Sequence, residues 1–230
     1  MKRITDPLKL MNAKIETSNG CLPIKIHGRK LKNIEIRIDI PSAQIKSGII
    51  LAALNVKDKS TIFETNITRN HTEIMLEYFE ADIKIKKKNF ENQIFVNGKK
   101  ELVSKNISIP SDLSSAAFFI VAALINKNSF IKMNNININP TRDGILRALN
   151  LMQANIQINN KRTINGELIG DLEIKTSELR GCELESNYAR LMIDEYPILS
   201  IAAAFAKSPS VFKAAKISPD LTCAEGNSSL

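Results

Sequence analysis

The residues best suited to chemistry lie at the starts of predicted helices, directly after predicted strands. Ser42, Ala43 and Gln44 open one helix, Arg69 comes just before the next, and Asp194 comes just before a third. The free N–H groups of a first helical turn, together with the helix dipole, bind anions. A guanidinium pairs with phosphate or carboxylate, and a carboxylate beside a cleft can accept a proton. These five residues predict a site for an anionic substrate with one acid–base group.

Several neighbouring residues leave two readings open. Lys46 either adds a donor to the anion site at Gln44 or is a solvated lysine on the same helix. His71 is more typical of a packing or capping residue than of a catalytic one, and no catalytic triad can be assembled. Of the adjacent acids Asp194 and Glu195, one is expected to cap the following helix while Asp194 does the chemistry.

Two further helix starts carry caps and acids that favour a purely structural role. They lie at residues 110–115 and 139–144, where a serine or aspartate precedes an apolar run. Pro197 is predicted as the first residue of the helix that follows Glu195. The N–H of a first helical residue makes no hydrogen bond within the helix, so proline, which has no N–H, fits there.

The elements that hold these residues repeat along the chain in the order strand, helix, strand, helix, strand, strand. The first copy is predicted at 33–39, 42–54, 60–65, 72–81, 82–86 and 93–96, and the second at 106–109, 114–125, 129–133, 141–154, 155–158 and 171–174. A third copy begins with a helix at 197–206 and a strand at 210–212, and an earlier one ends with a helix at 6–12 and strands at 14–16 and 23–26. The fold class is therefore α/β, with repeated βαβαββ units.

Composition narrows the functional classes. The chain has 230 residues, 43% of them hydrophobic, and a net charge of +8. Its longest apolar run, residues 116–125, is far shorter than the roughly 20 residues of a membrane span, so we expect a cytoplasmic protein with no membrane partner. Tryptophan is absent and aromatic residues make up 5%, which argues against nucleic-acid binding, and the lysines of residues 83–86 alternate with isoleucine as a solvated strand face would.

Cysteine usage argues against disulfides and against a metal site. The three cysteines are odd in number and widely spaced, and no two of them form a ligand pair. We therefore expect reduced thiols and no bound metal.

Five motifs, taken in order and spacing, resemble the bacterial 5-enolpyruvylshikimate-3-phosphate synthases. They are Ser42-Ala43-Gln44-Ile45-Lys46-Ser47, Thr68-Arg69-Asn70-His71-Thr72-Glu73-Ile74-Met75-Leu76, Ser114-Ser115-Ala116-Ala117-Phe118-Phe119, Asn139-Pro140-Thr141-Arg142 and Ile193-Asp194-Glu195-Tyr196-Pro197-Ile198-Leu199. The resemblance implies a fold of two halves, each built from three βαβαββ units, with helix starts directed into the cleft between them. It covers residues 1 to about 216 and only the middle half of the family chain, so both halves would be incomplete.

The resemblance also implies the reaction. The family transfers the enolpyruvyl group of phosphoenolpyruvate to the 5-hydroxyl of shikimate 3-phosphate, a step toward chorismate and the aromatic amino acids, and it uses no cofactor. Ser42, Ala43, Gln44 and Arg69 resemble the shikimate 3-phosphate contacts, with Gln44 also near phosphoenolpyruvate. Asp194 resembles the carboxylate that binds the shikimate hydroxyls and takes the proton from the attacking one.

The resemblance divides the chain into residues 1–106 of a first half, residues 107–216 of a second half and a tail at 217–230 that is unlike the family. The tail stands where the family has Leu-Arg-x-Lys-Glu-Ser-Asp-Arg, and it contains no lysine. An altered reading frame would produce such a shift. The family's upstream Asp-Lys-Ser loop, its Gly-Thr segment and an arginine that binds phosphoenolpyruvate also have no counterpart here, so we expect this chain alone to be inactive.

Three readings of function stay open at this point. In the first, which the family resemblance implies, the chain is a 3-phosphoshikimate 1-carboxyvinyltransferase that is active only if complementary fragments supply the missing motifs. In the second, it is a non-catalytic remnant of a broken gene. The third reading is the related UDP-N-acetylglucosamine 1-carboxyvinyltransferase, which shares the fold but is expected to lack the Arg69 to Leu76 signature.

Overall fold

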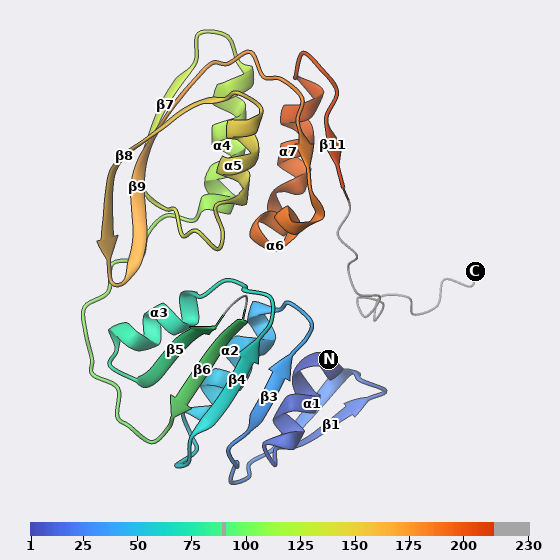
Figure 1. Ribbon diagram of the computed structural model, residues 1–230, viewed down its shortest axis with the longest axis vertical. Helices are drawn as coiled ribbons and strands as arrows, with labels where there is room; N and C mark the ends of the chain where they lie inside the picture. The colour runs from blue at the N-terminus through green and yellow to red at the C-terminus, as the bar shows by residue number, and fades with distance from the viewer. Residues whose placement is uncertain (89–90, 214–230) are drawn as a thin grey trace. The chain divides into compact units, whose positions relative to one another are not determined.

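The computed structural model describes residues 1–88 and 91–213, so the predicted tail at 217–230 lies outside the described residues. Internal contacts divide the chain into two compact units, with Met1–Lys105 in unit 1 and Asn106–Lys216 in unit 2. Figure 1 colours unit 1 from blue to green and unit 2 from green to red. Each unit is described by itself below.

Unit 1 is a small sheet with helices, joined to a hairpin near the N-terminus. Its elements are α1 (Lys2–Leu10), β1 (Lys14–Ser18), β2 (Cys21–His27), β3 (Glu35–Ile38), α2 (Ala43–Ala53), β4 (Ser60–Glu64), α3 (His71–Tyr78), β5 (Asp82–Lys88) and β6 (Glu91–Asn97). Strands β1 and β2 pair antiparallel, and the larger sheet has the order β3-β4-β6-β5. Within it, β3 and β4 are parallel and the other pairs are antiparallel.

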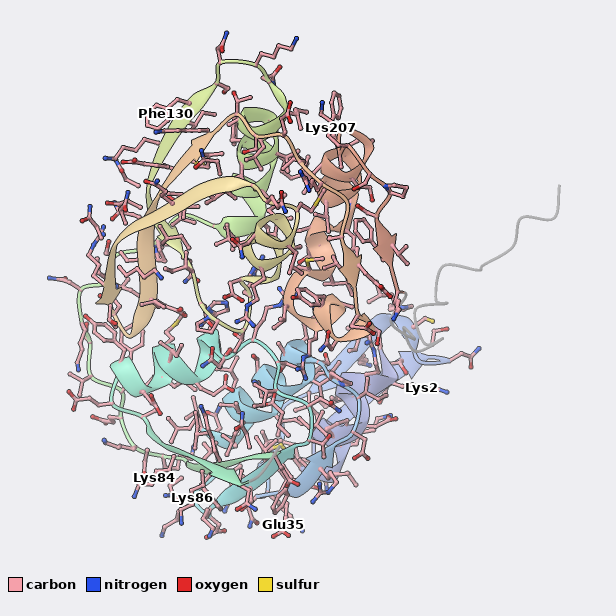
Figure 2. The ribbon with its side chains drawn as sticks, turned by 45° about the horizontal axis from the view of Figure 1, so that its top comes forward. Lys2, Glu35, Lys84, Lys86, Phe130 and Lys207 are labelled. Atoms are coloured by element: carbon pink, nitrogen blue, oxygen red, sulfur yellow. The ribbon has the colours of Figure 1, made fainter. Side chains whose placement is uncertain are left out.

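One face of the larger sheet is apolar and is covered by helices. Ile62 of β4 and Ile94 of β6 are fully buried, and they share a core with Ile49 of α2 and Leu76 of α3. The alternation along β5 sends lysines to the other side, and Figure 2 shows Lys84 and Lys86 projecting away from the ribbon. The prediction of a solvated lysine face is confirmed.

Unit 2 contains a second, similar sheet and a compact group of helices. Its elements are α4 (Leu113–Ile125), β7 (Phe130–Asn137), α5 (Gly144–Leu151), β8 (Asn155–Ile164), β9 (Glu167–Lys175), β10 (Glu183–Leu184), η1 (Ser186–Tyr188), α6 (Ala189–Met192), η2 (Ile193–Glu195), α7 (Tyr196–Ala204) and β11 (Val211–Phe212). The sheet order is β7-β9-β8, with antiparallel pairs, and β10 pairs parallel with β11.

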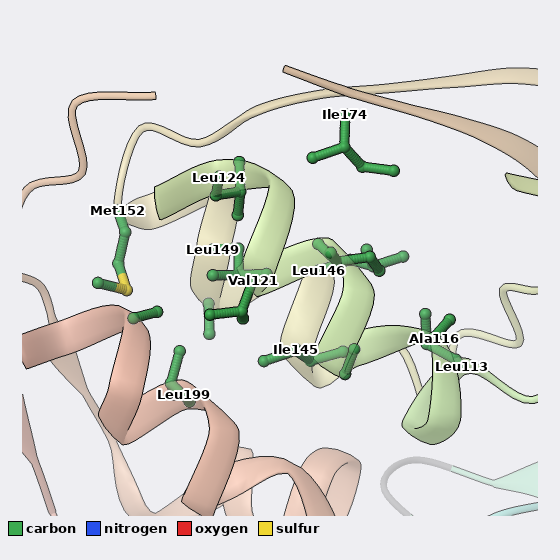
Figure 3. Close-up of a cluster of buried hydrophobic side chains, with 14 of the residues drawn as sticks. Leu113, Ala116, Val121, Leu124, Ile145, Leu146, Leu149, Met152, Ile174 and Leu199 are labelled. Atoms are coloured by element: carbon green, nitrogen blue, oxygen red, sulfur yellow. The ribbon is translucent and has the colours of Figure 1, made fainter. Parts of the chain in front are cut away.

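Helix α4 is the centre of the unit 2 core. Its residues Ile120, Val121 and Leu124 are at most 1% exposed, because the helix meets both the sheet and the helices α5 and α7. Figure 3 shows Val121 and Leu124 of α4 in one cluster with Leu149 of α5 and Leu199 of α7. A helix that is apolar on most sides is the expected sequence for this position.

The repeat prediction is largely confirmed, with one strand that does not form. Residues 106–109 were predicted as the first strand of the second copy, but in the described structure they have no strand conformation. Ile107 and Ile109 are 45% and 85% exposed, and only Ser111 forms a parallel bridge, to Ile136 of β7. Alternating apolar residues do not make a strand unless a partner strand accepts their backbone hydrogen bonds.

The helices of the described ranges are all shorter than a membrane span. No helix within residues 1–88 and 91–213 is long and apolar enough to cross a bilayer. The longest of these helices, α4, has 13 residues.

Candidate substrate-binding site

The starts of α2 and α3 lie at one edge of the unit 1 sheet. Strands β3 and β4 are parallel neighbours, and each runs directly into the loop before a helix. Their ends are joined by a hydrogen bond of 3.2 Å from Thr65 Oγ1 to the carbonyl oxygen of Ile38. The carboxyl ends of parallel strands are where ligands bind in α/β sheets, so this edge is the candidate site of unit 1.

Ser42 caps α2 as predicted. Its backbone is extended, and its Oγ accepts a hydrogen bond from the backbone N–H of Ile45 at 3.4 Å. The N–H groups of Ala43 and Gln44 belong to the first turn and have no carbonyl partner within the helix. Gln44 is exposed, while Ser42 and Ala43 are half-buried, so the helix start presents donors at the surface of the unit.

Arg69 lies in the turn that connects β4 to α3. The preceding residue, Thr68, donates to Glu64 Oε1 through both its backbone N–H, at 2.9 Å, and its hydroxyl, at 2.6 Å. These bonds fix the turn to the end of β4. Arg69 is half-buried, and so is His71, the first residue of α3.

The prediction that Lys46 adds a donor to the anion site is wrong, and so is the alternative of a solvated lysine. Lys46 is 1% exposed, and its Nζ lies 2.9 Å from Glu64 Oε1 and 2.7 Å from Glu73 Oε1. Lys46 lies on the buried face of α2, three and four residues before Ile49 and Ile50, so its side chain enters the interior of the unit. The ammonium is therefore fully engaged with two buried carboxylates.

The helix starts of unit 2 also converge. Ser111 bridges the end of β7, so α4 and α5 begin at the same edge of that sheet. Asp112 caps α4, since its Oδ2 accepts 2.9 Å hydrogen bonds from the N–H and the hydroxyl of Ser115. The helix cap predicted within residues 110–115 is confirmed.

Helix α5 begins at Gly144, three residues later than the predicted start at Thr141. Asn139 Oδ1 accepts hydrogen bonds from the N–H of Thr141 at 2.9 Å and from its hydroxyl at 2.7 Å, which holds residues 139–141 in a turn instead of a helix. Arg142 follows this turn.

Arg142 joins the α5 start to the α4 start. Its Nη2 lies 2.5 Å from Ser114 Oγ and 3.3 Å from Asp112 Oδ1. Burial alone would raise the pKa of Asp112. The hydrogen bonds from Ser115 and the charge of Arg142 outweigh burial, so the pKa of Asp112 lies below its ordinary value. Asp112 is therefore a stable anion near neutral pH.

Ser114 extends this network to the start of α7, because its hydroxyl donates to the carboxylate of Glu195. Glu195 is 3% exposed and occupies the N-cap position of α7, but its side chain does not cap that helix. The expectation that one of the two adjacent acids caps α7 is therefore not met by Glu195. It is a buried link between helices instead.

Asp194 is exposed beside this buried link. It lies in η2, directly before α7, which begins at Tyr196 with Pro197 as the next residue. The prediction of Pro197 as the first helical residue is off by one position. Consecutive residues of a helical turn point in different directions, and this explains how Glu195 is buried while Asp194 faces outward.

In the described structure, the predicted site residues therefore fall into two groups, one in each unit. Ser42, Ala43, Gln44 and Arg69 belong to one edge of unit 1, and Asp194 belongs to the convergent helix starts of unit 2. Within residues 1–88 and 91–213, no cluster of three His, Cys, Asp or Glu side chains could hold a metal ion.

The residues that hold these groups together were not predicted as functional. Glu64 was not singled out, Glu73, Ser114 and Arg142 appeared only as members of motifs, and Glu195 was considered only as a possible helix cap. Their signal in the sequence is weak, since each partner is far away along the chain, 81 residues in the case of Ser114 and Glu195. Glu64 at the end of a buried strand was the one hint, because an acid there needs a partner.

Comparisons with known proteins support this architecture, first through the fold alone and then through a relative of similar sequence. The enolpyruvyl transferase NikO from Streptomyces tendae has the same fold, with a TM-score of 0.67 over 92% of this chain and 51% of that chain at 11% identity. The chain therefore has an enolpyruvyl transferase fold. EPSP synthase from Acinetobacter baumannii superposes with a TM-score of 0.79 at 41% identity, over 92% of this chain and 48% of that chain.

The particular family follows from sequence. The family described as EPSP synthase (3-phosphoshikimate 1-carboxyvinyltransferase) matches residues 1–218. The 3-phosphoshikimate 1-carboxyvinyltransferase of Petrotoga mobilis is 45% identical over 94% of this chain, and that of Thermoanaerobacter sp. is 41% identical over 94%. The chain belongs to the EPSP synthase family, and it spans about half the length of the curated relatives that it matches.

Proposed function

We propose that the chain carries part of the active site of a 3-phosphoshikimate 1-carboxyvinyltransferase. Unit 1 would bind shikimate 3-phosphate through the α2 start and Arg69, and unit 2 would supply Asp194. The single observation that carries this proposal is the placement of Ser42, Gln44 and Arg69 at one edge of the unit 1 sheet, in a chain that belongs to this family.

The chemistry of the proposed substrates suits these residues. Both shikimate 3-phosphate and phosphoenolpyruvate are anions, and helix starts and guanidinium groups stabilise anions. Asp194 would accept the proton of the 5-hydroxyl as the hydroxyl oxygen bonds to the central carbon of phosphoenolpyruvate, while the terminal CH2 carbon takes up a proton from a general acid and becomes a methyl group. The resulting intermediate would then release phosphate, with the loss of a proton restoring the double bond.

Turnover should need more than these 230 residues. The family resemblance assigns a lysine, a glutamate and several arginines to motifs that this chain lacks. Groups that act as a unit lose most of their effect when some are removed. We infer that residues corresponding to the rest of the relatives' length, within one polypeptide or as a complementary fragment, complete the site.

We also propose which acceptor the chain serves and where in the cell it is located. The UDP-N-acetylglucosamine reading is disfavoured, because the family match and the relatives' names both point to 3-phosphoshikimate as the acceptor. A cytoplasmic location is consistent with the cysteine spacing and with soluble, charged substrates.

The test is phosphate release from phosphoenolpyruvate in the presence of shikimate 3-phosphate. The chain alone should give no turnover, and a chain completed with the missing segments of the Petrotoga mobilis relative should be active. Asp194→Asn should remove that activity, whereas Asp58→Asn, which changes an exposed turn aspartate, should not. An inactive completed chain that is folded, or an active Asp194→Asn variant, would overturn the proposal.

A further inference from the structure

A buried ionic network lies directly beneath the proposed substrate edge of unit 1. Lys46 contacts Glu64 at 2.9 Å and Glu73 at 2.7 Å, and all three side chains are at most 3% exposed. Lys46 comes from α2, Glu64 from the end of β4, and Glu73 from the first turn of α3. The three residues therefore join the elements that carry the proposed ligands.

Glu64 connects this network to the turn that carries Arg69. Besides Lys46, its Oε1 accepts two hydrogen bonds from Thr68, and its Oε2 accepts one from Asn92 Nδ2 at 3.1 Å. A carboxylate with this many donors is held in one orientation. The neighbour of Arg69 is thereby tied to Lys46, and through Lys46 to the α2 start.

Burying the charges of this network costs free energy, so the network is a poor way to stabilise the fold. It contains one cation and two carboxylates, and Glu73 Oε2 has no hydrogen-bond partner among the described residues. Burial is the main reason that the pKa of Glu73 is raised, and the nearby Lys46 offsets this only partly. Buried ion pairs are often no more stabilising than well-packed apolar residues, so stability alone does not explain this arrangement.

We propose that Lys46, Glu64 and Glu73 are positioning residues that fix the α2 start relative to the turn before α3, so that Ser42, Gln44 and Arg69 contact one ligand together. This buried clamp rests on the function proposed above and adds a role for residues that touch no substrate. A second tie, the 2.6 Å hydrogen bond between Ser47 Oγ and Thr72 Oγ1, joins the same two helices near their starts.

A positioning role for the clamp and a purely structural role predict different results for two substitutions of Glu73. Glu73→Gln keeps an oxygen for Lys46 and should preserve the geometry, whereas Glu73→Ala removes the link. Leu76→Val is the matched control, because Leu76 is buried on the same helix and lies outside the clamp. All three variants are made in the 230-residue chain, with urea unfolding to establish that each is folded.

The first measurement needs no ligand. Amide chemical shifts from nuclear magnetic resonance should change at residues 42–44 and 68–71 together in Glu73→Ala, and should stay near those of the wild type in Glu73→Gln and Leu76→Val. The second measurement is titration with shikimate 3-phosphate. Loss of a hydrogen bond to a charged group costs enough to weaken binding about tenfold or more in Glu73→Ala, with changes under about threefold in the other two.

The outcomes separate the clamp from the proposed function. If Arg69→Ala leaves shikimate 3-phosphate affinity unchanged, the proposed function fails, and the amide shifts alone then decide whether the clamp exists. If Arg69→Ala abolishes binding while Glu73→Ala binds like the wild type, the clamp is wrong and the function stands. Equal losses in Glu73→Ala and Glu73→Gln, or in Glu73→Ala and Leu76→Val, would also overturn it.

Discussion

The hydroxyl of Ser114 donates a hydrogen bond to the buried carboxylate of Glu195, 81 residues further along the chain. This bond joins the first turn of α4 to the start of α7, and Arg142 from the α5 start contacts the same hydroxyl. Three helix starts of unit 2 therefore meet at one serine, beside Asp194.

Replacing Ser114 by alanine should destabilise unit 2. The change leaves Glu195 buried without its donor, and an unsatisfied buried group costs about 1–3 kcal/mol, with more for a charged one. The measurement is urea unfolding of the chain. Ser115→Ala is the control, because that hydroxyl bonds Asp112 at the exposed surface. A cost for Ser114→Ala no greater than for Ser115→Ala would contradict the role given to this bond.

The stability of unit 1 should depend on pH through Glu73. Burial raises its pKa in the folded state above the ordinary value of 4.5, so the folded chain binds this proton more tightly than the unfolded chain does. The contribution is complete below pH 4.5 and is lost as pH rises through the folded-state pKa. The free energy of unfolding of Glu73→Gln minus that of the wild type should therefore increase with pH, by at most about 1.4 kcal/mol per unit. A difference that stays flat or decreases over this range would show that the sign is wrong.

Gly144 should not tolerate a side chain. A Cβ at this position would lie 2.8 Å from the Cβ atoms of both Leu191 and Met192, where α5 meets α6. Forcing atoms into a packed contact costs about 1–3 kcal/mol, so Gly144→Ala should lower the thermal midpoint. Gly28→Ala provides the comparison, because nothing lies within 4 Å of its added Cβ. Equal midpoints for the two variants would argue against the close approach of α5 and α6.

Unit 2 exposes aromatic residues that should promote self-association. Phe118 and Phe119 of α4 are 59% and 62% exposed, and Phe205, just after α7, is 63% exposed. Exposed apolar surface of this kind favours association. Phe118→Gln combined with Phe119→Gln should raise the concentration at which light scattering begins, with little change in unfolding free energy. Unchanged scattering would mean that these side chains are not the contact surface.

Much of this architecture could be predicted from the sequence because its signals are local. Ser42 and Asp112 cap helices as expected, since a cap needs only the residues of its own turn. The strand predicted at 106–109 failed for the opposite reason. Ile107 and Ile109 alternate as a strand would, but no neighbouring strand pairs with them in the described structure.

The buried network around Lys46 could not be predicted from the residues next to it in the sequence. A lysine in a helix is normally solvated, and its burial depends on Glu64 and Glu73, which reach it only after the chain has crossed the sheet. The same holds for Glu195, whose partner Ser114 lies on another helix. The residues expected to contact substrate were found from motif and family resemblance, whereas the residues that hold them in place required the structure.

The most direct test of the account is a titration of the 230-residue chain with shikimate 3-phosphate, followed by amide chemical shifts. Unit 1 alone supplies the α2 start and Arg69, so we expect weak, saturable binding with a Kd of about 1 mM, or roughly −4 kcal/mol, and shift changes at residues 42–44 and 69. Arg69→Ala should abolish it, and Arg37→Ala, an arginine of the same unit that pairs with Glu91 instead, should not. Binding that survives in Arg69→Ala, or shift changes that avoid these residues, would contradict the assignment of this edge as the substrate site.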